Sequence, residues 1–272
     1  GGRAGGRNAY LIAKGVGIAG DVDAKTLQMQ AAGLDEPVEP VAVRMPGQAY
    51  EAEAYRLHWS WADERLYLEQ QLTAALGRSS DNAGVAAESS GLSADSVGLM
   101  LHATAESQAD LQFNALHSTL YYKDTLMVCE GVSGLQVADA YWEPAENRVT
   151  VLPNGRLETL EDAVLYFSDT YPAYTFYQVT GQIQSAWRYE ADGWYTYEAP
   201  GLEPQPVHFD RIYVRKTDST SEATATLDEE YLFLDEGFEF SGKLTASAQA
   251  AAERESPDLH FDGSAGLRSR LL

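Results

Sequence analysis

With 272 residues, of which 44% are hydrophobic and 11% aromatic, the chain is long enough to bury a substantial core and too apolar to be disordered throughout. Its 19 Lys and Arg against 41 Asp and Glu give a formal charge of −22, which argues against a nucleic-acid partner. No apolar run reaches the roughly 18 residues that a membrane-spanning helix needs. Cys129 is the only cysteine, which excludes an intrachain disulfide, and we expect it to be buried in a strand.

The first part of the chain, residues 1–76, predicts a β-rich N-terminal segment. Its opening stretch, Gly1–Arg7, is basic and glycine-rich, and no long apolar run follows it as in a signal peptide. Short apolar runs and prolines then favour short strands or irregular connections, with a short helix over 24–32 as the alternative. Bulky residues alternate over 55–61 and recur shortly afterwards, which predicts a hairpin.

A change of composition marks a boundary in the middle of the chain. Residues 77–95 contain almost no large apolar side chain, so we expect a loop or linker there. Residues 96–272 then predict a repeat-like antiparallel β domain. Asn154-Gly155 and Asp192-Gly193 accept the left-handed backbone of a tight turn, so each dipeptide predicts a hairpin turn.

Strands follow one another quickly in this second part. Apolar patterns predict the first of them over 111–116, 118–122, 126–130 and 134–141. A further strand over 173–185 alternates clearly, which indicates one buried and one solvated face. Its bulkier face is expected to contain Tyr177, Val179, Gly181 and Ile183.

One strand phrase occurs twice near the C-terminus, as Phe238-Glu239-Phe240-Ser241-Gly242-Lys243-Leu244 and as Leu259-His260-Phe261-Asp262-Gly263-Ser264-Ala265. In both copies an apolar residue, a Phe and a Gly fall on one face of a strand. The phrases are 21 residues apart, from Phe240 to Phe261, which suits one strand, one connection and one return strand. They indicate architecture rather than chemistry.

Motifs that carry chemistry are missing from the sequence. The five histidines have no metal-ligand spacing, and neither a Gly-x-Ser-x-Gly elbow nor a Gly-x-x-x-x-Gly-Lys loop is present. The run Gly15–Gly20 matches a dinucleotide fingerprint, but Pro37 and Pro40 fall where its βαβ unit should continue. We therefore predict no catalytic, cofactor-binding or metal-ligating residue and lean against an enzyme. A glycosidase stays open, because it needs only two suitably placed carboxylates. The candidate acids are Glu158, Glu161, Asp162, Asp228, Glu229, Glu230, Asp235 and Glu236.

One group of aromatic residues is a candidate ligand-binding surface. It consists of Trp187, Tyr189, Trp194, Tyr195 and Tyr197. Flat rings displayed on a hairpin can stack on sugar rings or on a partner protein. The ordinary alternative is that cross-strand aromatic pairs hold the hairpin together and cover a core.

A series of phrases in fixed order resembles a group of very long, uncharacterised proteins of Gram-negative bacteria over about residues 111–272. The phrases are Val137-Ala138-Asp139-Ala140, Val149-Thr150-Val151, Leu160-Glu161-Asp162-Ala163-Val164-Leu165, Val179-Thr180-Gly181-Gln182-Ile183, Tyr189-Glu190-Ala191-Asp192-Gly193-Trp194-Tyr195, Val207-His208-Phe209-Asp210-Arg211-Ile212 and the two Phe-containing strands. The resemblance implies a segment of a large cell-envelope or secreted β protein with no assigned activity. The serial strands are also similar, at the level of fold, to the β-jelly-roll domains that bridge lipopolysaccharide across the periplasm.

We therefore expect an all-β protein whose serial antiparallel hairpins form an elongated sheet, an open jelly roll or a solenoid, with a less regular N-terminal part. The leading functional hypothesis is a non-enzymatic structural or interaction segment of a larger envelope or secreted protein, with a protein or glycan partner. The alternative is a domain that binds, or less readily cleaves, a carbohydrate or glycolipid. A third hypothesis, transport of a lipid, requires the apolar strand faces to line an open groove. The missing initiator Met leads us to expect a longer polypeptide.

Overall fold

The computed structural model describes residues 12–13, 16–31, 40–69, 98–167, 174–248 and 259–267. The chain is all-β and built from serial antiparallel hairpins, as predicted. It divides into two compact units, one formed by Gly1–Ser133 with Glu146–Glu158 and the other by Gly134–Ala145 with Thr159–Leu272. The loop or linker predicted over 77–95 lies outside the described residues.

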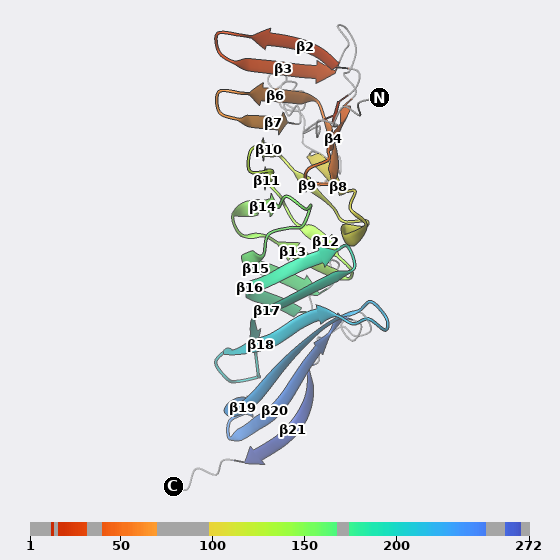
Figure 1. Cartoon of the computed structure of the whole chain (residues 1–272). Coiled ribbons are helices and arrows are strands. Elements are labelled where there is room, and N and C mark those ends of the chain that lie inside the picture. Colours follow the sequence, from red (N-terminus) through yellow and green to blue (C-terminus); the bar gives the residue numbers. More distant parts are fainter. Residues whose placement is uncertain are drawn as a thin grey trace, which may run out of the picture. The chain divides into compact units, whose positions relative to one another are not determined.

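The strands described in unit 1 form two antiparallel sheets (Figure 1). The five-stranded sheet has the order β1 (Ile12–Ala13), β4 (Val41–Met45), β5 (Tyr50–Ala54), β8 (Leu99–Ala103) and β9 (Gln112–Ala115). The seven-stranded sheet has the order β14 (Arg148–Val151), β11 (Leu126–Glu130), β10 (His117–Tyr121), β7 (Arg65–Glu69), β6 (Arg56–Ser60), β3 (Thr26–Ala31) and β2 (Val16–Asp21). Successive hairpins therefore alternate between the two sheets. A short 3₁₀ helix, η2 (Glu106–Gln108), lies between β8 and β9.

Four hairpin turns of unit 1 share one backbone conformation. Each is a four-residue turn, and its last residue has a positive φ: 54° at Lys25, 54° at Ala49, 59° at Glu64 and 54° at Thr125. The third of these turns joins β6 to β7, so the hairpin predicted after residue 55 is confirmed. The helix considered over 24–32 is wrong, because Thr26–Ala31 forms strand β3 and pairs with β2 and β6.

The described residues of unit 2 form a nine-stranded antiparallel sheet, and Figure 1 shows its last four strands side by side in chain order. Its strands are β12 (Leu135–Val137), β13 (Ala140–Glu143), β15 (Leu160–Phe167), β16 (Tyr174–Ser185), β17 (Arg188–Tyr197), β18 (Gln205–Val214), β19 (Ser221–Asp235), β20 (Phe238–Ser247) and β21 (His260–Leu267). Between β13 and β15 the chain returns to unit 1 through η3 (Ala145–Asn147), and it adds β14 beside β11 there.

The two copies of the C-terminal phrase pair with each other, as β20 and β21. Gly242 lies opposite Gly263, and the rings of Phe240 and Phe261 meet edge to face at 5.1 Å. A Cβ at Gly242 would lie 3.2 Å from the Phe240 ring, and a Cβ at Gly263 would lie 3.1 Å from the same ring. The glycines thus leave room for Phe240 to cover both strands, which confirms the predicted strand and return strand.

The two predicted tight turns have different outcomes. Gly155 has a φ of +79° in the turn after Val151, so the turn at Asn154-Gly155 is confirmed. The turn predicted at Asp192-Gly193 is wrong, because both residues lie inside β17 at an irregularity of the strand pairing. Gly193 serves close packing instead, since a Cβ there would lie 2.8 Å from a Val179 methyl group.

Within the described residues, no helix has the length and apolar character needed to cross a membrane.

Candidate functional site

The inner face of the unit 2 sheet is filled with aromatic side chains. Trp142, Phe167, Tyr174, Phe176, Tyr189 and Phe209 are all fully buried. Their rings contact one another, mostly edge to face, for example Trp142 with Tyr189 at 5.2 Å and Phe176 with Phe209 at 5.3 Å. The apolar residues Val179, Ile183 and Leu244 beside them are 0–1% exposed. These strand faces are a packed core rather than an open lipid groove.

The five aromatic residues predicted as one surface differ in their burial in the structure. Tyr189 is fully buried, and Tyr195 packs inward against the rings of Tyr174, Phe176 and Phe209. Burial raises the pKa of the Tyr189 and Tyr195 hydroxyl groups. Tyr197 is half-buried, and its ring lies edge to face with that of Phe261, 6.2 Å away. Only Trp187 and Trp194 expose large parts of their rings, at 59% and 42%.

Trp194 belongs to a different group of rings, on the outer face of the sheet. We call this group the aromatic row: Tyr141, Tyr166, Tyr177, Trp194 and His208. Its members come from β13, β15, β16, β17 and β18, which are consecutive neighbours in the sheet. Tyr141 is the register partner of Tyr166, and Trp194 is the register partner of both Tyr177 and His208. Tyr166 pairs with Thr175, two residues before Tyr177, so the row crosses the strands with a step of two residues between β15 and β16, instead of following one hairpin.

Ring contacts are present at the two ends of the aromatic row. The rings of Trp194 and His208 are 4.9 Å apart, and those of Tyr141 and Tyr166 are 6.4 Å apart. Tyr177 is 47% exposed and reaches this face because of a bulge. Its neighbour Gln178 has a φ of 50°, and the register of β16 against β17 shifts just after Tyr177. The prediction that Tyr177 shares a face with Val179 is wrong for this reason.

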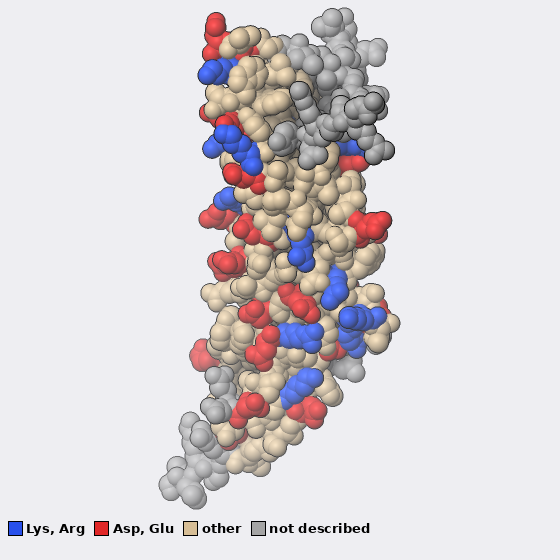
Figure 2. Space-filling model, in the orientation of Figure 1, with Lys and Arg blue, Asp and Glu red and all other residues tan. Residues whose placement is uncertain are grey.

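Carboxylates flank the aromatic row. The hydroxyl of Tyr166 donates to Glu143 Oε2 at 3.0 Å; burial and this bond raise the pKa of Tyr166 to about 12. His208 lies between two aspartates, with Nε2 3.3 Å from Asp192 Oδ2 and Nδ1 3.4 Å from Asp210 Oδ1. On the face drawn in Figure 2, acidic and basic side chains are interspersed among the described residues.

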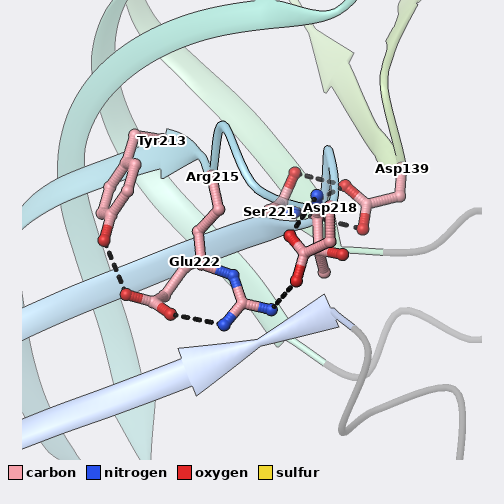
Figure 3. Close-up of polar contacts among 7 residues, drawn as sticks. Asp139, Tyr213, Arg215, Asp218, Ser221 and Glu222 are labelled. Carbon is pink, nitrogen blue, oxygen red and sulfur yellow. Dashed lines mark hydrogen bonds and ion pairs between the residues drawn. The ribbon is translucent and has the colours of Figure 1, made fainter.

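A hydrogen-bonded chain through the buried Ser221 joins three segments of unit 2. Tyr189 donates its hydroxyl proton to Ser221 Oγ at 2.7 Å, and Ser221 donates its own to Asp139 Oδ1. The backbone N–H of Ser221 also donates to Asp139 Oδ1, at 2.9 Å (Figure 3). Ser221 is 0% exposed, so a substrate cannot reach this serine. Sequence reasoning missed the arrangement, because Asp139 and Ser221 are 82 residues apart.

A second polar cluster fixes the turn between β18 and β19. The Arg215 guanidinium lies between Asp218 and Glu222, with N–O distances of 2.6 and 3.4 Å (Figure 3). Tyr213 donates to the other oxygen of Glu222 at 2.6 Å, which together with burial raises the pKa of Tyr213. The backbone N–H of Thr220 donates to Asp218 Oδ1 at 3.2 Å. The single guanidinium pairs with both carboxylates, and these contacts hold the turn.

Cys129 and the acids considered for a glycosidase do not form a site among the described residues. Cys129 is buried in β11 as predicted, and desolvation raises the pKa of its thiol to about 12. The side chains of the described acids considered for a glycosidase are exposed: Glu158, Glu161, Asp162, Asp228, Asp235 and Glu236. Among the described residues, no group of three or more His, Cys, Asp or Glu is close enough to hold a metal ion.

No family model matches the sequence, and searches of curated proteins and of solved structures return no significant match. The geometry of unit 2 is therefore the basis for a functional proposal.

Proposed function

We propose that this chain is a non-enzymatic structural or interaction segment of a larger cell-envelope or secreted protein. The observation that carries the proposal is the use of the buried polar groups of unit 2. The hydrogen bonds among Tyr189, Ser221 and Asp139 hold a turn and two strands together. A hydrolase would instead expose its nucleophile beside a base, whereas Ser221 is buried. The filled aromatic interior supports the same conclusion, since it leaves the outer sheet faces to meet partners.

Two experiments test this proposal. The purified chain should not turn over a panel of glycosides and esters above the buffer rate. Turnover that disappears in a folded Ser221→Ala variant would overturn the proposal, because it would give the buried serine a catalytic role. Fractionation of the source cells should recover the parent protein from the envelope or the medium. Its recovery from the cytosol alone would contradict the proposed location.

A second candidate function is the binding of a glycan or glycolipid. It is favoured by Trp194 and Tyr177, two exposed aromatic residues that are register partners on neighbouring strands. Calorimetric titration with polysaccharides and with lipopolysaccharide tests it. Saturable binding that is weakened in Trp194→Ala supports this function, whereas no heat of binding from a folded protein counts against it.

A further inference from the structure

The aromatic row has the dimensions of an extended binding surface. Neighbouring strands in a sheet are about 4.8 Å apart, so five consecutive strands carry the row over roughly 19 Å. Tyr177 and Trp194 are 47% and 42% exposed, and the side chain of His208 is 37% exposed. A ligand that contacts the whole row must therefore be long and narrow, and it must run across the strands.

The chemistry of the surface selects the class of this ligand. The rings offer apolar faces, and the carboxylates of Glu143, Asp192 and Asp210 offer hydrogen-bond acceptors beside them. A sugar ring presents an apolar C–H face and a rim of hydroxyl donors, which matches both features. The carboxylates and the net charge of −22 repel phosphate, sulfate and uronate groups, whereas a protonated amino group is attracted.

We infer that the aromatic row binds an extended chain of neutral or amino sugars, lying across β13 to β18. This inference rests on the second candidate function and specifies both its surface and its ligand. Tyr177 and Trp194 provide the central stacking platform. Asp192 and Asp210 orient His208 beside that platform and favour hydroxyl or ammonium donors. Trp187, although more exposed, is at the turn between β16 and β17 and lies outside the row.

Isothermal titration calorimetry of the whole chain tests the inference with four probes: cellohexaose, cellobiose, a chitosan hexamer and polygalacturonate. The hexamers should bind at least about tenfold more tightly than cellobiose, and polygalacturonate should not bind. Trp194→Ala and Tyr177→Ala should each weaken hexamer binding by about tenfold or more, as truncation of a central aromatic contact does. The matched control Trp187→Ala should leave the affinity within about twofold.

A further variant tests the role of charge. Asp192→Asn keeps the shape of the side chain but removes its charge. The affinity for the chitosan hexamer should therefore fall relative to that for cellohexaose, while cellohexaose still binds. Circular dichroism and thermal melting confirm that each variant is folded.

The outcomes separate the inference from the function on which it rests. Hexamer binding that is insensitive to Trp194→Ala and Tyr177→Ala overturns the inference and leaves glycan binding to another surface. A preference for polygalacturonate overturns the assigned ligand class. The absence of any glycan binding overturns both, and binding of a protein partner that Trp194→Ala abolishes would assign the row to protein recognition instead.

Discussion

The hydroxyl group of Tyr189 donates to Ser221 Oγ at 2.7 Å, and this bond connects strands β17 and β19 across 32 residues of sequence. Ser221 in turn donates hydrogen bonds to Asp139, which lies in the turn between β12 and β13. A buried tyrosine hydroxyl needs such an acceptor, because leaving it unpaired costs about 1–3 kcal/mol. The contact therefore explains how the aromatic core of unit 2 tolerates the hydroxyl group of Tyr189.

We predict that Ser221→Ala lowers the free energy of unfolding by about 1–3 kcal/mol, because it leaves the Tyr189 hydroxyl without its acceptor. Urea denaturation measures the change. Ser264→Ala, an exposed serine of the same sheet, should alter stability by less than about 0.5 kcal/mol. In a double-mutant cycle, Asp139→Asn and Ser221→Ala should be non-additive. Additive effects would show that the two residues act independently.

We predict that Gly263→Ala disrupts the pairing of β20 with β21. A Cβ at this position would overlap the carbonyl oxygen of Ser241 and lie 2.8 Å from Gly242 Cα. Hydrogen exchange of the β21 amides should accelerate strongly in this variant. The matched control is Gly266→Ala in the same strand, where a Cβ would approach other atoms no closer than 3.8 Å. Equal exchange rates in the two variants would contradict the steric explanation.

The class of fold could be predicted from the sequence because strand alternation is a local signal. Several hairpin turns could not, because unit 1 places Lys25, Ala49, Glu64 and Thr125 in the left-handed conformation without using glycine. Conversely, the Asp192-Gly193 dipeptide resembles a turn but lies in a strand, where the glycine is needed for contact with Val179. A turn dipeptide shows only that the backbone can adopt a positive φ. Tertiary packing decides whether a turn or a strand forms there.

The candidate site was only partly predictable, for a related reason. The sequence identifies Trp194 as a candidate but groups it with Tyr189 and Tyr195 of the same hairpin, and those two residues face the core. Its neighbours in the structure are Tyr177 and His208, which lie opposite Trp194 on the two adjacent strands. The bulge at Gln178 places Tyr177 on the outer face, and no local sequence pattern predicts this bulge.

We predict that stability falls as the pH rises above about 10. Burial is the main cause that raises the pKa of Tyr50 and Tyr189 in the folded protein above the ordinary value near 10. The unfolded chain therefore binds fewer protons than the folded one above pH 10, and each group lowers stability by about 1.4 kcal/mol per pH unit in that range. Tyrosinate absorbance near 295 nm should show a delayed class of tyrosines that ionises only together with unfolding. Ionisation of all tyrosines before unfolding would disprove this.

We predict that the thiol of Cys129 does not react with a disulfide reagent in the folded protein at pH 8. Burial raises its pKa to about 12, so almost no thiolate is present, and the sulfur is 0% exposed. In urea the thiol should react completely, and its rate of reaction at intermediate urea concentrations should follow the opening of unit 1. Rapid modification of the native chain would place Cys129 in an accessible pocket.

The path of the chain between Ser133 and Thr159 has a consequence for the order of synthesis. The ribosome releases β12 and β13, which belong to unit 2, before β14, the last strand of unit 1. No single cut can therefore yield two complete units. A fragment ending at Ser133 lacks β14 and leaves the apolar strand β11 as a bare edge, which favours aggregation. A fragment starting at Thr159 lacks Asp139 and so loses the anchor of Ser221. Each unit matures only after part of the other has been made.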